Sequence, residues 1–119
     1  MTILRQVNRS VAVIKPLQPY VDWCNSMPDI EKTGKYTLED AQDDCLALLV
    51  PTRMFMPGYD RWINKIYKDI FAEMLNAWCT DSGLWPKDVT LAMFREWFKV
   101  EIHSEVLDTT SKALIHETE

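Results

Sequence analysis

The sequence contains little glycine and no paired cysteines, and both shortages argue against common kinds of site. Only 3 of its 119 residues are glycine, so a glycine-rich loop that cradles phosphate cannot be built. Cys24, Cys45 and Cys79 are widely spaced without a CxxC pair, which argues against a zinc knuckle and a dithiol redox site. We expect these cysteines to be small buried hydrophobic residues in a reducing cytoplasm. No GxSxG motif surrounds Ser82, so the usual serine-hydrolase signature is also missing.

Basic clusters and long hydrophobic runs are missing as well. The 13 lysines and arginines stand singly along the chain, while 18 aspartates and glutamates give a net charge of -5. Because nucleic-acid-binding proteins usually carry a basic stripe, we expect no nucleic-acid partner. No apolar run approaches the roughly 20 residues that span a bilayer, and the first residues are too polar for a signal peptide. We therefore expect no membrane partner and a cytoplasmic location.

Apolar residues, by contrast, are plentiful. They make up 47% of the chain, and 11% of the chain is aromatic, which is enough for one hydrophobic core. We expect a single domain over residues 1–108 and a polar C-terminal tail over residues 109–119. No motif indicates a cofactor.

The spacing of apolar residues predicts three strands and four or so helices. The strands are expected at 10–15, 45–50 and 100–107. The first two are apolar on both faces, whereas the third alternates apolar and charged residues. The helices are expected at 19–27, 38–43 and 58–79 and directly after Thr90. The longest helix has a continuous apolar stripe and should form the centre of the core.

This order of elements predicts an α/β fold in which a small three-stranded, at least partly parallel sheet packs with four or so helices. The connections of roughly 30 and 50 residues are long enough for crossovers between parallel strands. With the first strand in the middle, helices can cover both faces of the sheet. With the second strand in the middle, one apolar face stays open for a second subunit. The charges of the third strand place that strand at an edge.

His103 lies between Glu101 and Glu105 at a spacing of two, which on a strand places all three side chains on one face. A carboxylate beside a histidine can orient the imidazole as a general base, and the same groups could hold a divalent metal. The alternative, purely structural interpretation is that these residues form the charged, solvated face of an edge strand.

Glu39, Asp40, Asp43 and Asp44 form a dense acidic cluster. Hard cations such as Mg²⁺ or Ca²⁺ prefer carboxylate oxygens, so these four residues are candidate metal ligands. Thr37 and Asp40 also have the spacing of a capping box, which explains acidic residues at the start of a helix without any ligand.

The chain contains five tryptophans, four of which fall on predicted helical core stripes. The fifth, Trp85, precedes Pro86 on a predicted loop. Because tryptophan is enriched at interfaces and in ligand pockets, Trp85 is the best candidate for an exposed anchor or for the wall of a small-ligand pocket.

Four short motifs are distributed along the chain. They are Asn8-Arg9-Ser10-Val11, Lys15-Pro16-x-x-Pro19-x-x-Asp22-Trp23, Trp85-Pro86, and Phe94-x-x-Trp97-Phe98-x-Val100-Glu101-x-His103-Ser104. Together they resemble an uncharacterised family of small bacterial proteins over most of residues 8–108. The resemblance implies a bacterial, cytosolic protein, and it implies no catalytic residue because no established activity belongs to that family.

The sequence therefore predicts a non-catalytic module that forms a homo-oligomer, such as a homodimer, or binds another protein. The two strands that are apolar on both faces and the many tryptophans are the basis of this prediction. The alternative is a small hydrolase or metal-dependent enzyme centred on His103 with Glu101 or Glu105.

Overall fold

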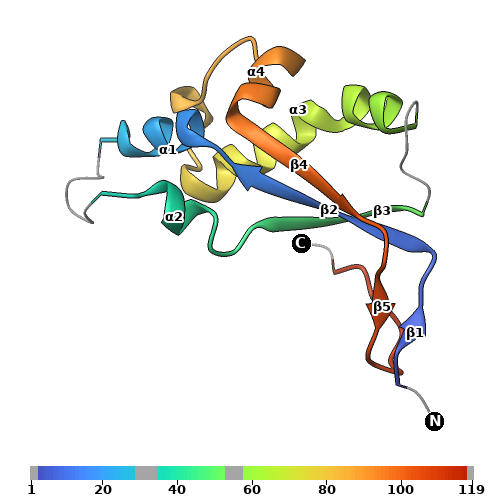
Figure 1. The fold of residues 1–119 in the computed structure, drawn as a ribbon. Coiled ribbons are helices and arrows are strands. Elements are labelled where there is room, and N and C mark those ends of the chain that lie inside the picture. Colours follow the sequence, from blue (N-terminus) through green and yellow to red (C-terminus); the bar gives the residue numbers. More distant parts are fainter. Residues whose placement is uncertain (1–2, 29–34, 53–57, 118–119) are drawn as a thin grey trace.

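The computed structural model describes residues 3–28, 35–52 and 58–117 of the chain (Figure 1). Within these ranges a short 3₁₀ turn covers Ser82–Leu84. The other elements, in chain order, are β1 (Arg5–Gln6), β2 (Arg9–Pro16), α1 (Gln18–Asn25), α2 (Leu38–Ala41), β3 (Leu46–Pro51), α3 (Gly58–Trp78), α4 (Leu91–Trp97), β4 (Phe98–His103) and β5 (Leu107–Asp108). None of the helices in these ranges has the length and apolar character needed to cross a membrane.

The strands form two sheets, and every pair of neighbouring strands is antiparallel. The larger sheet has the order β3-β2-β4, with both outer strands antiparallel to β2. The prediction of an at least partly parallel sheet is therefore wrong. The prediction of three strands in one sheet is confirmed, as is the edge position of the strand that carries Glu101. The smaller sheet is a ribbon of β1 and β5, which the sequence analysis did not predict.

The connection from β2 to β3 sets the antiparallel direction of β3. It contains α1 and α2 and returns the chain to the end of β2 at which it left the sheet. Strand β3 starts there, with Leu46 opposite Ile14.

The long helix α3 connects β3 to β4. Its 21 residues span about 32 Å, so it returns the chain along the full length of the sheet. Strands β3 and β4 consequently run in the same direction, but β2 lies between them (Figure 1). The crossover that the sequence predicted exists, although it joins strands that are not neighbours.

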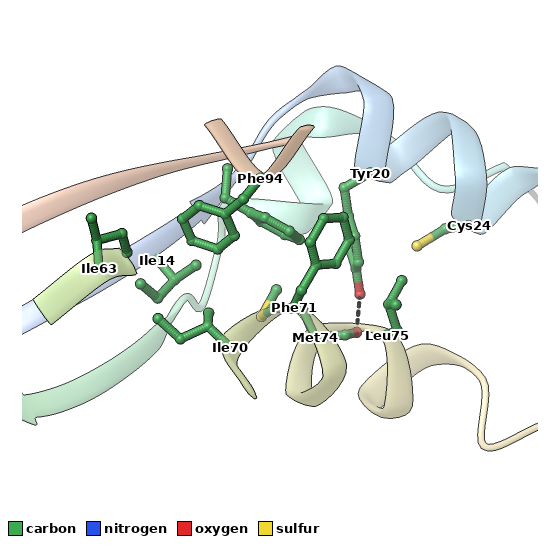
Figure 2. Packing of buried hydrophobic residues seen from close by; sticks show 10 residues of the cluster. Ile14, Tyr20, Cys24, Ile63, Ile70, Phe71, Met74, Leu75 and Phe94 are labelled. Atoms are coloured by element: carbon green, nitrogen blue, oxygen red, sulfur yellow. Dashed lines mark hydrogen bonds between the residues drawn. The ribbon is translucent and has the colours of Figure 1, made fainter. Parts of the chain in front are cut away.

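Helix α3 covers one face of the three-stranded sheet, as its apolar stripe predicted. Its buried residues are Ile63, Ile70, Phe71, Met74 and Leu75. They pack against sheet residues such as Ile14 and against the aromatic rings of α4 and β4 (Figure 2). The ring centroid of Phe71 lies 5.1 Å from that of Phe98 and 6.2 Å from that of Phe94, both in edge-to-face geometry. This cluster is the core of the molecule.

The molecule is longer than a compact chain of its size. Its radius of gyration is 16.5 Å and its longest extent is 53 Å, against about 13.5 Å for the radius of a compact chain of this length. The β1–β5 ribbon causes the difference because it projects away from the sheet and helices (Figure 1). Arg5 stabilises the ribbon by lying 3.7 Å from the carboxylate of Asp108 and by donating a hydrogen bond to the carbonyl oxygen of Thr110.

Candidate functional site

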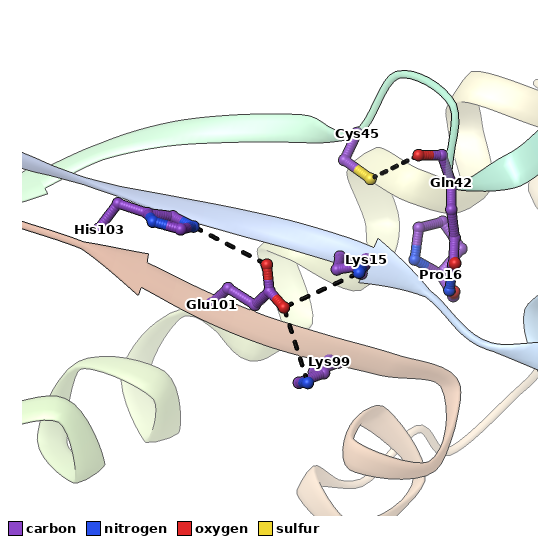
Figure 3. Close-up of polar contacts among 7 residues, drawn as sticks. All are labelled: Lys15, Pro16, Gln42, Cys45, Lys99, Glu101 and His103. Atoms are coloured by element: carbon purple, nitrogen blue, oxygen red, sulfur yellow. Dashed lines mark hydrogen bonds and ion pairs between the residues drawn. The ribbon is translucent and has the colours of Figure 1, made fainter.

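The face of the sheet opposite α3 has no helix over it within the described residues (Figure 3). Residues that pair directly on antiparallel strands share a face, so the strand register defines which side chains this open face carries. One half, the apolar side, consists of Val11, Val13, Ala47 and Leu49. The other half, the charged side, consists of Lys15, Lys99, Glu101 and His103. The open face is therefore apolar on the side of β3 and charged on the side of β4.

Glu101 is the centre of the charged side (Figure 3). Its Oε2 atom lies 3.6 Å from Lys99 Nζ and 3.8 Å from Lys15 Nζ, and its Oε1 atom lies 3.8 Å from His103 Nε2. Solvent-exposed ion pairs of this kind contribute little to stability. Their main effect is to make this half of the face unfavourable for an apolar partner.

The structure brings His103 beside Glu101 but does not build an active site around them. The side chain of His103 is 59% exposed. Glu105 lies two residues beyond the end of β4, so the expected three-residue strand face does not form. Among the residues that the structure describes, no group of three or more His, Cys, Asp or Glu side chains could hold a metal.

The acidic cluster is explained by helix capping at Asp40. The Thr37 backbone N–H donates to the Asp40 carboxylate at 3.2 Å, and the Asp40 N–H donates to the Thr37 hydroxyl at 3.0 Å. This confirms the predicted capping box. Helix α2 ends at Ala41, so Asp43 and Asp44 follow it on exposed bends and do not extend the helical arc that Glu39 and Asp40 begin.

Trp85 lies on a loop but is half-buried. Its indole N–H donates to the carbonyl oxygen of Cys79 at 2.8 Å, and its ring packs against the main core. The exposed large apolar side chain at this place is Leu84, which is 43% exposed. Trp85 thus acts as a packing residue in this structure.

A small cavity of about 250 Å³ lies between α2, α3 and the ends of β2 and β3, where Tyr20, Tyr36 and Cys45 contribute to its lining. The Tyr20 hydroxyl donates to the carbonyl oxygen of Met74 at 2.8 Å, and burial raises the pKa of Tyr20 well above its usual value. Burial also raises the pKa of Cys45, and it raises the pKa of the nearby Cys24 thiol to about 12. Neutral hydroxyls and thiols are poor nucleophiles, so the raised pKa values of these side chains count against a nucleophilic role for them.

A second cavity, of about 610 Å³, is a groove between the sheet, the β1–β5 ribbon and the residues that follow β5. We call it the C-terminal groove. Its apolar lining comes from three separate segments, and its polar lining includes Arg9, Asp108, Lys112 and Glu117. The large apolar side chains that line it are Leu49, Leu107, Leu114 and Ile115. These four side chains are 51%, 46%, 68% and 76% exposed, respectively.

The groove joins the apolar side of the open face. Leu49 belongs to both, and the segment after β5 turns back from the ribbon toward β3 (Figure 1). Ile3 and Leu4, which precede β1, are exposed as well. The groove carries four of the seven exposed large apolar side chains among the residues that the structure describes.

The sequence analysis missed Leu114 and Ile115 because it assigned residues 109–119 to a polar tail. The signal that could have found them is the uncharged run Ala113-Leu114-Ile115 in an otherwise polar segment. The sequence predicted a strand at 45–50 that is apolar on both faces. The spacing of apolar residues does not determine whether this strand lies at an edge of the sheet.

Comparison of the chain with models of known families, with curated proteins and with solved structures finds no match. The resemblance to a family of small bacterial proteins therefore stays a prediction.

Proposed function

We propose that the chain is a non-catalytic, cytoplasmic module that associates with a second copy of itself through the C-terminal groove and the apolar side of the sheet. One observation carries this proposal: Leu49, Leu107, Leu114 and Ile115 converge on a single groove although three of them are distant from Leu49 in sequence. Large contiguous apolar patches are rare on monomeric proteins and mark interaction sites.

The energetics favour covering this region. Complete burial of a Leu or Ile side chain contributes about 1.5–3 kcal/mol, so four half-exposed side chains leave several kcal/mol of hydrophobic free energy unused. A second copy supplies the same apolar side chains, and its groove carries two basic and two acidic residues that can pair across a twofold axis. The charged side next to it has the character of the polar rim that surrounds such interfaces.

No observation favours the enzyme alternative to the same degree. His103 and Glu101 are neighbours, but His103 lines neither of the two cavities described above. A general base needs a concave site in which a substrate is held within hydrogen-bond distance. The groove that does exist is lined by apolar groups and by residues without catalytic geometry.

The proposal is tested by light scattering coupled to size-exclusion chromatography over a range of micromolar concentrations. We expect the wild-type chain to be dimeric and the variant Leu49→Asp to be monomeric. Leu84→Asp is the matched control, because Leu84 is similarly exposed but lies far from the groove, and this variant should remain dimeric. Circular dichroism shows whether each variant is folded. A wild-type chain that is monomeric at every concentration contradicts the proposal.

A further inference from the structure

Strand β3 is an edge strand that lacks, before Pro51, the charged side chains that usually protect an edge from pairing. In the described part of the chain it pairs only with β2, so its other edge has no partner strand. Residues 46–50, Leu-Ala-Leu-Leu-Val, contain no charge. Natural sheets usually protect an edge with charged side chains, as β4 does with Lys99 and Glu101. The edge of β3 is therefore suited to accept another strand.

The C-terminal segment, residues 109–117, is a second element without a partner strand among the described residues. It contains no helix or strand, yet it carries the uncharged run Ala113-Leu114-Ile115, in which Leu114 and Ile115 are among the most exposed large apolar residues described. Its direction is set by a series of local hydrogen bonds: the Thr110 N–H donates to Asp108 at 2.8 Å, and the Lys112 N–H donates to Thr110 at 3.2 Å. These bonds turn the segment toward the sheet.

The acceptor edge and the unpartnered segment face the same groove. Leu49 of β3 and Leu114 and Ile115 of the C-terminal segment all line it. Residues 113–117 form no strand, and among the described residues β3 pairs only with β2. Within one chain the segment therefore lines the same groove as Leu49 without pairing with β3.

We propose that two copies of the chain exchange their C-terminal segments, so that residues 113–115 of each copy add as a strand to the free edge of β3 in the other. This inference rests on the proposed self-association and specifies its geometry. Strand addition satisfies the unpaired backbone groups of both elements, and alternate side chains of the added strand enter the groove. A twofold axis makes the exchange reciprocal, so both grooves are filled by the same contact.

The second copy is favoured over other occupants by chemistry and by shape. Donor and acceptor are both uncharged, whereas a foreign acidic or basic peptide would gain little from an uncharged edge. Donor and acceptor belong to the same chain and lie beside the same groove, so a second copy can supply both through one twofold contact.

The test uses a donor variant, Leu114→Asp with Ile115→Asp, and the acceptor variant Leu49→Asp. The control, Ser111→Asp with His116→Asp, adds two aspartates to the same segment outside the apolar pair. We expect the dissociation constant of the dimer to rise roughly 100-fold or more in the donor variant and to change little in the control. The substituted tail residues are exposed, so all these chains should fold.

Mixing distinguishes exchange from any other interface. The donor variant keeps an intact β3 edge, and the acceptor variant keeps an intact C-terminal segment, so an equimolar mixture should form a heterodimer through one intact contact. Native mass spectrometry identifies this species by its mass. We expect heterodimers at concentrations where each variant alone is monomeric.

The other outcomes overturn the inference in distinguishable ways. If the donor variant stays dimeric while Leu49→Asp is monomeric, the exchange is wrong and the proposed self-association stands. If the mixture stays monomeric, the reciprocal exchange is wrong. If the wild type is monomeric, both proposals are wrong, and hydrogen exchange shows whether residues 113–115 are protected by their own β3.

Discussion

The two faces of the three-stranded sheet have similar residues but different surroundings. On β2, Ala12 and Ile14 are fully buried beneath α3, whereas Val11 and Val13, which alternate with them, are only half-buried on the open face. Both sets are apolar, so the difference does not come from β2 itself. It comes from the single long helix, which crosses one face, whereas no described helix covers the other.

The open face teaches a second point, because its two halves differ as well. The β4 half carries an ion cluster around Glu101, while the β3 half carries Ala47 and Leu49 with no charge. The charged half resists an apolar partner and the uncharged half favours one. Substitutions on the two faces and on the two halves should therefore change the free energy of unfolding by different amounts.

The largest effect is expected on the covered face. Phe71 is fully buried and its ring contacts those of Phe94 and Phe98, so Phe71→Ala removes a large side chain and leaves a cavity. We expect the free energy of unfolding to fall by about 3–5 kcal/mol. Leu49→Ala on the open face should change it by no more than about 0.5 kcal/mol. Urea denaturation of both variants, diluted until the chain is monomeric, measures the difference.

Equal losses in the two variants would contradict the comparison, since they would mean that the open face is as well packed as the covered one. Unfolding at low concentration is essential here. In a dimer, Leu49→Ala would also report on the interface.

The positions of the elements could be predicted from the sequence because they depend on local patterns. The apolar stripe of 58–79 and the Thr37–Asp40 capping box each depend on residues a few positions apart, and both appear in the structure. The direction of the strands depends on where the chain goes between them. Connection length allowed a parallel sheet, but the connection through α1 and α2 returns to the end of β2 that it left, so β3 is antiparallel.

The candidate site was less predictable because it joins segments that are distant in sequence. Leu49 and Ile115 come together through the β1–β5 ribbon, whose strands have two residues each and give no periodic signal. His103 and Glu101 attracted attention through their spacing, but spacing on a strand does not reveal whether the face is concave. Exposure and cavity shape decide that, and both are tertiary properties.

A smaller effect is expected from the titration of Cys24, which is fully buried in the core. Burial raises the pKa of this thiol to about 12 from an ordinary value of 9.0. Above pH 9 the unfolded chain releases the thiol proton while the folded chain keeps it, so alkaline pH favours unfolding. We expect the free energy of unfolding to be unaffected by this thiol below pH 9 and to fall by up to about 1.4 kcal/mol per pH unit above it.

The variant Cys24→Ala is the control for this titration. It should have a flatter pH profile between pH 9 and 10, below the range where Tyr20, whose pKa is also raised by burial, begins to contribute. An unchanged slope in that interval would show that water reaches the thiol. The core between α3 and the sheet would then be accessible to water, although its residues are closely packed.

The smallest effect is expected on the charged half of the open face. Glu101→Gln removes the carboxylate shared by Lys15, Lys99 and His103, but their side chains are about one-third or more exposed. Water and salt screen such pairs, so we expect a loss of about 0–1 kcal/mol that shrinks further at 1 M salt. The dimer should keep its dissociation constant, because Glu101 lies outside the groove and the apolar side that are proposed to associate. A dimer that Glu101→Gln strengthened or abolished would place the charged half inside the interface and remove the distinction between the two halves.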